Sequence, residues 1–218
     1  MKKTWIAILT LALTGAASSL AQAETVTSVN AVGMVRISVN SGQLTIVNFP
    51  FSTDGDTDYS VSELFDNLPN GTRVHFWIDQ SWVTESKGRG GWSPNTTPIT
   101  RATAMFIDVP SDEPEPTYEV IFSGVVPGSN EMTSVLPIES GLNLISFPYP
   151  TAVSILEAGF TPGNGDAVHF WTGTSWATES FGRGSWSPGT TVIQPGQGFF
   201  YASGGNYVWE SNKPYLWP

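Results

Sequence analysis

The sequence predicts a mainly β protein made of two tandem homologous β-rich domains, each with about six strands and one short helix. Residues 74–99 align with residues 168–193 without a gap, and most of the aligned positions are identical. Runs of β-branched and aromatic residues also recur at short intervals, bounded by glycine and proline. A unit written twice in this way predicts two domains related by a pseudo-twofold axis.

The composition excludes several classes of protein. The chain has 218 residues, of which 40% are hydrophobic and 13% are charged, so it is too apolar to be disordered. Its formal net charge of −10 disfavours nucleic acid as a partner, because nucleic-acid recognition needs Lys and Arg to neutralise phosphates. The absence of cysteine excludes disulfides, thiolate metal sites and cysteine nucleophiles.

The N-terminal residues have the pattern of a secretory signal peptide. Lys2 and Lys3 precede an apolar stretch over residues 5–20, and Ala21-Gln22-Ala23 has the small-x-small spacing that signal peptidase recognises. We therefore expect residues 1–23 to be removed and the protein to be exported to the periplasm, the cell surface or the medium. A membrane anchor is the alternative, although the apolar stretch is short for a span. No later stretch is long and apolar enough to form a transmembrane helix.

The first domain is expected over residues 24–126. Its short helix is predicted at residues 60–67, where Ser60 is followed three positions later by Glu63 in the pattern of a capping box. The corresponding helix of the second copy would cover residues 151–158. The strands predicted for the first domain are 35–39, 44–49, 74–78, 82–86, 103–109 and 118–122.

The boundary between the two domains follows from the repeat. The acidic, proline-containing segment 111–116 resembles a linker, but its counterpart in the second copy is the short turn 203–206. We therefore predict a hairpin loop at 111–116 and place the junction within 124–130, which contains Pro127-Gly128. The second domain is then expected over 127–218.

The strongest candidate site is a tryptophan pair in each copy. In a hairpin centred on Asp79-Gln80, Trp77 and Trp82 lie opposite each other and share one face with His75. The opposite face, with Val74 and Phe76, is predicted to be core. An accessible indole pair would suit carbohydrate, because the C–H faces of sugars stack on aromatic rings. The alternative is that both faces are buried and the tryptophans only pack. The second copy repeats the pair as Trp171 and Trp176.

A glycine-rich segment follows each hairpin. Residues 88–92 are predicted to form a flexible loop in which Arg89 stacks on an indole or pairs with Glu85. This arrangement serves either as a clasp within the loop or as a contact for an acidic or hydroxyl-rich ligand. The candidate ligand-binding residues of these segments are Arg89, Trp92, Arg183 and Trp186.

Three carboxylates at alternate positions resemble the start of a calcium loop. Asp54, Asp56 and Asp58 could supply the clustered oxygen ligands that Ca²⁺ prefers. The segment departs from an EF-hand, which needs glycine where Tyr59 stands and glutamate where Phe65 stands. A solvated acidic turn is the alternative, and no other cofactor is expected.

The sequence offers no catalytic motif. The chain has two histidines, His75 and His169, which occupy the same position in the two copies. It contains neither a zinc-protease motif nor a nucleophile elbow nor a phosphate loop. Glu85 and Glu179 recur in the repeat, but one carboxylate per copy is not the pair that glycoside hydrolysis requires. We therefore predict no enzymatic activity.

A combination of motifs resembles a known class of proteins. The second copy has a strand ending in proline (144–148), a Phe-Trp-x-Gly-x-Ser-Trp hairpin (170–176) and a Pro-Gly-x-Gly-Phe-Phe element (195–200). The first copy departs from the last element over 101–106. The chain resembles secreted two-copy β-repeat proteins of environmental Gram-negative bacteria. This resemblance implies export and a surface or extracellular role.

Three functions remain open from the sequence. The first is an exported, non-catalytic structural or interaction protein whose aromatic residues and strand edges promote self-association or attachment to the cell envelope. The second is a carbohydrate-binding protein with one tryptophan site per copy, which would gain avidity from two linked sites. The third is a secreted hydrolase with carboxylates that the sequence does not identify.

Overall fold

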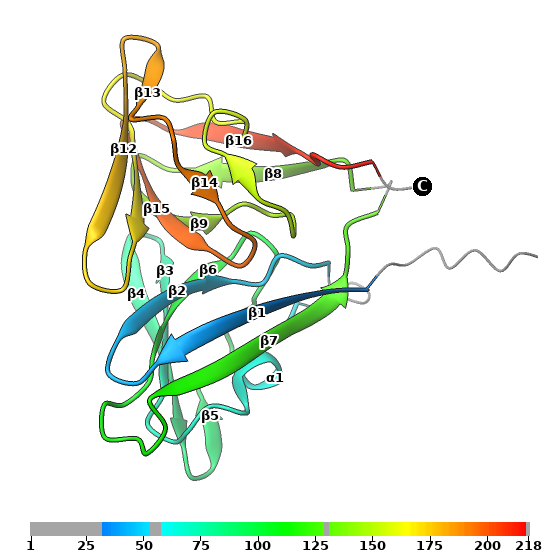
Figure 1. Ribbon diagram of the computed structural model, residues 1–218, viewed down its shortest axis with the longest axis vertical. Helices are drawn as coiled ribbons and strands as arrows, with labels where there is room; N and C mark the ends of the chain where they lie inside the picture. Colours follow the sequence, from blue (N-terminus) through cyan, green and yellow to red (C-terminus); the bar gives the residue numbers. More distant parts are fainter. Residues whose placement is uncertain (1–31, 53–57, 129–130, 217–218) are drawn as a thin grey trace, which may run out of the picture.

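The structure is a computed structural model, and it describes residues 32–52, 58–128 and 131–216. These residues form several antiparallel sheets and one short helix, so the prediction of a mainly β protein is confirmed. In Figure 1 the chain up to residue 125 (blue to green) occupies the lower half of the view, and the chain from residue 133 onward occupies the upper half. The predicted signal peptide, residues 1–23, lies outside the described residues.

The lower half contains a five-stranded antiparallel sheet. In spatial order it consists of β2 (Leu44–Asn48), β6 (Ala104–Asp108), β3 (Arg73–Ile78), β4 (Ser81–Gly88) and β5 (Gly91–Ser93). Four of these strands match predicted ones to within a few residues. They form because β-branched and aromatic side chains suit a pleated sheet with one buried face.

The upper half contains a second five-stranded sheet. In spatial order it consists of β9 (Gly141–Ser146), β15 (Gly198–Ser203), β11 (Ala167–Trp171), β12 (Trp176–Gly182) and β13 (Ser185–Ser187). The two sheets have the same strand order relative to the chain. In each sheet the first strand along the chain, β2 or β9, lies at the edge and pairs with the last one, β6 or β15.

Three antiparallel ribbons complete the fold (Figure 1). They pair β1 (Val32–Asn40) with β7 (Thr117–Val125), β8 (Thr133–Ile138) with β16 (Tyr207–Asn212), and β10 (Val153–Ser154) with β14 (Val192–Ile193). The predicted strands 35–39 and 118–122 are thus confirmed and extended. The segment 111–116 joins β6 to β7, which belong to different sheets, so it is a loop but not the predicted hairpin.

The predicted helix at residues 60–67 is confirmed as α1 (Val61–Phe65), and its N-terminal signal works as expected. The Glu63 carboxylate accepts a hydrogen bond from the Ser60 backbone N–H at 2.7 Å. That bond satisfies one of the amides that a helix start leaves without a partner. Val61 and Phe65 are buried, so the helix contributes one face to the core.

The second helix, predicted over residues 151–158, is absent from the structure and that prediction was wrong. Val153 and Ser154 instead form β10, and the Ile155 N–H donates to the Thr191 carbonyl at 3.0 Å. Leu156 N–H then donates to the Ser154 hydroxyl at 3.2 Å in a local turn. The backbone groups that a helix would use are therefore committed to strand pairing and to a side-chain turn.

The glycine-rich segments are hairpins, and the prediction of a flexible loop at residues 88–92 was wrong. Arg89-Gly90 forms a two-residue turn, after which β5 pairs with the end of β4. Gly91 has a φ of 101°, a value that favours glycine. The second copy has the same arrangement, with Arg183-Gly184 between β12 and β13.

Each half has its own aromatic core. In the lower half, Phe122 lies between Phe49 and Phe65, with ring centroids 5.7 Å apart in both pairs. In the upper half, Phe160 stacks on Trp209 at 4.5 Å. A third cluster joins strands of both sheets, and its buried members are Ile46, Ala104, Phe106, Leu144 and Phe200. The two sheets therefore pack against each other as one body.

Candidate functional site

The tryptophan hairpin of the lower half has the predicted register. Trp77 on β3 pairs with Trp82 on β4, and the intervening Asp79 and Gln80 have φ values of 49° and 57°. Two consecutive positive φ angles give a type I′ turn, whose twist matches that of the flanking strands. The indole rings of Trp77 and Trp82 meet edge to face, with centroids 4.9 Å apart.

The two faces of this hairpin have the predicted roles. Val74, Phe76 and Glu85 are buried on the inner face. On the outer face Trp77 and His75 are half-buried, whereas Trp82 keeps 51% of its surface exposed. Strand alternation therefore separates core side chains from accessible ones within a single hairpin.

The upper hairpin repeats this arrangement. Trp171 on β11 pairs with Trp176 on β12, and their ring centroids are 5.0 Å apart. Trp176 keeps 44% of its surface exposed, while Trp171 is half-buried. Each half thus presents one half-buried and one exposed indole on the face opposite its core.

The half-buried tryptophans tie the two sheets together by reciprocal hydrogen bonds. The indole Nε1 of Trp77 donates to the Leu142 carbonyl at 2.8 Å, and that of Trp171 donates to the Leu44 carbonyl at 2.6 Å. Gln80 Nε2 donates to the same Leu142 carbonyl at 2.9 Å. Each tryptophan therefore reaches the first strand of the opposite sheet, and these contacts fix the two hairpins relative to each other.

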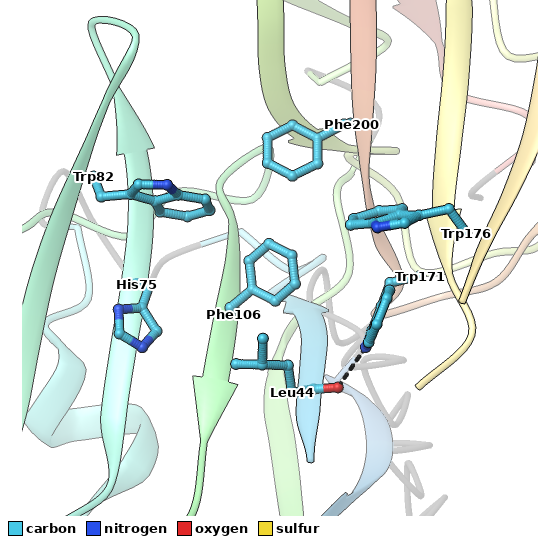
Figure 2. Close-up of a pocket in the computed structure, with 7 residues that line it drawn as sticks. All are labelled: Leu44, His75, Trp82, Phe106, Trp171, Trp176 and Phe200. Atoms are coloured by element: carbon cyan, nitrogen blue, oxygen red, sulfur yellow. Dashed lines mark hydrogen bonds between the residues drawn. The ribbon is translucent and has the colours of Figure 1, made fainter. Parts of the chain in front are cut away.

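Between the two hairpins lies an open, largely apolar groove of about 430 Å³. Figure 2 shows Trp82 and Trp176 extending toward each other from opposite sides, with Phe106 and Phe200 between them. Elements of both halves supply the lining residues, which are Leu44, His75, Trp82, Phe106, Trp171, Trp176 and Phe200. We call this feature the aromatic groove.

The phenylalanines hold the exposed tryptophans in place. Trp82 contacts Phe106 at a centroid distance of 5.7 Å and Phe200 at 6.2 Å. Trp176 contacts Phe200 at 5.8 Å and Phe106 at 6.4 Å. Three of these contacts are edge to face and the Trp176–Phe200 contact is tilted, and such arrangements are favourable for aromatic rings. Neighbouring phenylalanine rings therefore pack against both exposed indoles.

His75 is the titratable residue of the groove. Its Nδ1 lies 2.8 Å from the Thr84 hydroxyl oxygen, which fixes the orientation of the ring. Burial lowers the pKa of His75 below its usual 6.5, an effect that Asp108 opposes and Arg73 reinforces. His75 is therefore neutral at pH 7, and no lining residue carries a full charge there.

The other predicted ligand-binding residues lie away from the groove. Trp92 and Trp186 are buried in the cores of the lower and upper halves. Arg89 and Arg183 are exposed at the turns of the β4–β5 and β12–β13 hairpins. The structure thus brings together the two tryptophan pairs of the hairpins and leaves out the four residues of the glycine-rich segments.

The two glutamates that recur in the repeat, Glu85 and Glu179, bind backbone amides instead of the predicted arginine partner. Glu85 accepts hydrogen bonds from the backbone N–H groups of Thr96 and Thr97, at 2.9 Å and 2.7 Å. Glu179 accepts from the Gly189 N–H at 2.5 Å and from the Thr191 N–H at 3.0 Å. The carboxylates of Glu85 and Glu179 therefore hold the loops that follow Pro94 and Pro188, respectively.

The candidate calcium ligands are only partly described. Asp54 and Asp56 lie outside the described residues, whereas Asp58 is described and exposed. Within the described ranges, no group of three or more His, Asp or Glu residues is placed to hold a metal ion.

Sequence reasoning missed Leu44, Phe106 and Phe200 as groove residues. The repeat alignment places Phe106 on Phe200, but both lie in almost continuous apolar strands. Met105 and Ile107, the neighbours of Phe106, are fully buried on the opposite face. A strand that is apolar on both faces indicates that both faces are buried or contact another part of the protein. This pattern is the sequence signal that could have identified Phe106 and Phe200.

Comparison with known proteins identifies no relative: no family model, curated protein or solved structure matches this chain. In the part of the chain that the structure describes, the one helix is far too short to cross a membrane.

Proposed function

We propose that this protein is an exported, non-catalytic carbohydrate-binding protein with one binding groove per chain. The observation that carries the proposal is the aromatic groove, in which Trp82 and Trp176 are held by neighbouring rings and still keep about half of their surface exposed. Large exposed aromatic side chains gathered at one concave surface are typical of a binding site.

Carbohydrate is the ligand class that suits this lining best. The C–H faces of a pyranose ring stack on indole rings, and the sugar hydroxyl groups can remain hydrated where the groove is open. A peptide chain would bring a carbonyl and an N–H group at every residue, and burying them without partners is costly. Six of the seven lining residues lie on strands that have a neighbour on each side. The seventh, Leu44, lies on the edge strand β2, and its carbonyl already accepts a hydrogen bond from Trp171.

We further propose that residues 24–126 and 127–218 are two copies of one β-domain, arranged about a pseudo-twofold axis. The equivalent strand orders of the two sheets support this proposal, as do the reciprocal bonds from Trp77 and Trp171. In this arrangement the exposed tryptophan of each copy contributes one wall of a shared groove. The expected stoichiometry is one ligand per chain, in place of one per copy.

Export and the place of action are also part of the proposal. The basic start, apolar stretch and Ala21-Gln22-Ala23 pattern support removal of residues 1–23 and a location in the periplasm, on the cell surface or in the medium. The partner there would be a glycan, free or as a component of the cell envelope.

A depletion assay tests this function. Residues 24–218 are incubated with a panel of insoluble polysaccharides, and the protein left in solution is measured. We expect depletion by one polysaccharide, reversed by its soluble oligosaccharide, and at least a tenfold loss of affinity in Trp82→Ala and in Trp176→Ala. Leu156→Ala removes an exposed apolar side chain outside the groove and is the control. Undiminished depletion by the double tryptophan variant would contradict the proposal.

A second candidate function is self-association into a surface structure. The ribbons β1–β7 and β8–β16 carry exposed apolar residues, which are Val32, Met34, Ile121, Val135 and Val208. Exposed apolar ribbons favour association between chains. Sedimentation of residues 24–218 over a range of concentrations distinguishes the two functions, because a monodisperse monomer excludes this candidate.

A further inference from the structure

We propose that the aromatic groove takes an uncharged glycan, and that His75 recognises one of its hydroxyl groups through a hydrogen bond. This inference rests on the proposed carbohydrate function. It adds the charge class of the glycan and the residue that binds it.

The two histidines of the chain differ in their position relative to the groove. The lining includes His75 but not His169, which occupies the same position in the second copy. Each Nδ1 atom lies within hydrogen-bond distance of a threonine hydroxyl on the next strand, at 2.8 Å for Thr84 and 2.9 Å for Thr178. Both rings are half-buried, and burial lowers the pKa of both. The repeat therefore supplies two histidines with the same local partner, of which one lines the groove.

The charge of the lining selects against anionic glycans. None of the seven lining residues is Lys, Arg, Asp or Glu, and His75 is neutral at pH 7 because burial lowers its pKa. The charged neighbours of His75, Arg73 and Asp108, lie outside the lining and pair with each other at 3.7 Å. A sugar carboxylate or sulfate in the groove would therefore lose hydration without gaining a cationic partner. The net charge of −10 adds a long-range repulsion.

Among the side chains of the lining, His75 alone can accept a hydrogen bond, because an indole N–H only donates. Its Nδ1 is engaged with the Thr84 hydroxyl, whereas among the described residues its Nε2 has no partner. A threonine hydroxyl can donate or accept, so either neutral tautomer of His75 keeps this bond and leaves Nε2 as the acceptor or the donor. A sugar hydroxyl also donates and accepts. Neutral His75 can therefore bind it in either direction.

His75 lies beside the exposed indole of its own hairpin. The rings of His75 and Trp82 come from neighbouring strands, β3 and β4, and their centroids are 6.3 Å apart (Figure 2). A pyranose carries its hydroxyl groups around the edge of the ring. A pyranose stacked on Trp82 would therefore bring hydroxyl groups next to the imidazole.

Binding should depend on pH through His75. The side chains that face it from β3, β4 and β6 are Arg73, Trp77, Trp82, Thr84, Phe106 and Asp108. A ligand over His75 removes more water from the ring and so favours its neutral form. By linkage, an uncharged glycan should bind less tightly as the pH falls below the usual histidine pKa of 6.5. An anionic glycan should bind more tightly over the same range, because it would pair with the imidazolium.

Titration calorimetry on residues 24–218 tests the inference with defined hexasaccharides. The uncharged probes are the hexamers cellohexaose, maltohexaose, xylohexaose and chitohexaose, and hexagalacturonate is the anionic probe. We expect at least one uncharged probe to bind at pH 7, at least tenfold more tightly than hexagalacturonate. Its affinity should fall by about threefold or more between pH 7 and pH 5.

Histidine variants separate recognition from a structural role. His75→Leu should weaken binding of that probe by about tenfold, because it removes the hydrogen bond. His75→Gln keeps an amide that donates and accepts, so it should retain more affinity than His75→Leu and abolish the pH dependence. His169→Leu and His169→Gln are the matched controls, since they remove the same bond to a threonine outside the groove. Both controls should leave the affinity and its pH dependence unchanged.

Each contrary result overturns a defined part of the inference. Equal losses of affinity in His75→Leu and His169→Leu would mean that the histidines are structural, and would remove the role of His75. Tighter binding of hexagalacturonate, or an affinity that rises toward pH 5, would overturn the uncharged class and leave the carbohydrate function standing. Binding of no glycan would overturn both proposals.

Discussion

At the residue scale, the role of each tryptophan depends on the face of the strand that carries it. Trp82 and Trp92 belong to neighbouring strands of one sheet, yet Trp92 is buried in the core and Trp82 is half exposed in the groove. The pair register puts Trp82 opposite Trp77, on the face away from Val74 and Phe76. An indole can therefore be assigned to the core or to an accessible face only once the register of its strand is known.

The two histidines also belong to this scale, because burial lowers the pKa of both His75 and His169 below the usual 6.5. The folded protein then binds fewer protons than the unfolded chain as the pH falls below 6.5. Its free energy of unfolding should consequently decrease through that range. Urea unfolding between about pH 5 and pH 7 measures the effect.

A double variant isolates the histidine contribution to this pH dependence. His75→Gln with His169→Gln should give a flatter curve over the same range, since glutamine does not titrate. The carboxylates titrate at lower pH and remain unchanged in the variant. A curve as steep as that of the unmodified protein would show that other groups cause the acid sensitivity.

At the scale of elements, the buried glutamates hold the loops that close each sheet. Glu179 on β12 is almost fully buried and accepts hydrogen bonds from Gly189 and from both the N–H and the hydroxyl of Thr191. Burial raises the pKa of this carboxyl, but the hydrogen bonds from Thr191 and Gly189 outweigh it and leave the pKa below its usual 4.5. The ionised carboxylate is thus the form that stabilises the loop.

We predict that Glu179→Gln lowers the free energy of unfolding by about 1–3 kcal/mol at neutral pH, because the amide turns a donor toward the donors of the loop. The contribution of Glu179 should be present above pH 4.5 and be lost as the pH falls through its lowered pKa. Urea unfolding measures the difference. Glu157→Gln, on an exposed carboxylate, is the matched control and should change the stability little.

Elements with a local signal were predictable from the sequence. The strands of the lower sheet follow from β-branched runs, and α1 follows from the Ser60–Glu63 pair. The helix expected at 151–158 failed because repeat symmetry was applied to a segment whose backbone pairs with β14. The short strands β5 and β13 were missed because their glycines suggested a loop, whereas a positive φ at Gly91 closes a hairpin.

At the scale of the whole molecule, the sequence predicted one tryptophan pair in each copy, either accessible or buried, but not the meeting of the two pairs in one groove. Hairpin register is a local property, and the residues of each pair are only five positions apart. The packing of one half on the other depends on Ile46, Ala104, Phe106, Leu144 and Phe200, which come from four strands. The sequence repeat makes these strands equivalent, but it does not show that they pack against each other. Under the proposal of one shared groove, the avidity expected from two separate sites is lost.

The packing of the two sheets against each other can be tested by adding a single methyl group at Gly198. Gly198 begins β15, and a Cβ atom there would lie 2.5 Å from Ile46 Cγ2 and 2.6 Å from Ala104 Cβ. Ile46 and Ala104 would have to move to make room for the added methyl group, and the close packing of protein interiors leaves them little space to do so. Gly198→Ala should therefore lower the free energy of unfolding by about 1–3 kcal/mol through overpacking.

Gly198→Ala also tests whether the packing of the two sheets affects ligand binding. If the groove is shared, separating the sheets at Gly198 moves Trp82 away from Trp176, so Gly198→Ala should weaken oligosaccharide binding although Gly198 does not line the groove. Gly205→Ala is the control, because a Cβ atom there meets nothing within 4 Å. Calorimetry and urea unfolding of both variants measure the two effects. Unchanged affinity in a destabilised Gly198→Ala protein would mean that each half binds its ligand independently, since only a site built from both halves responds to the distance between them.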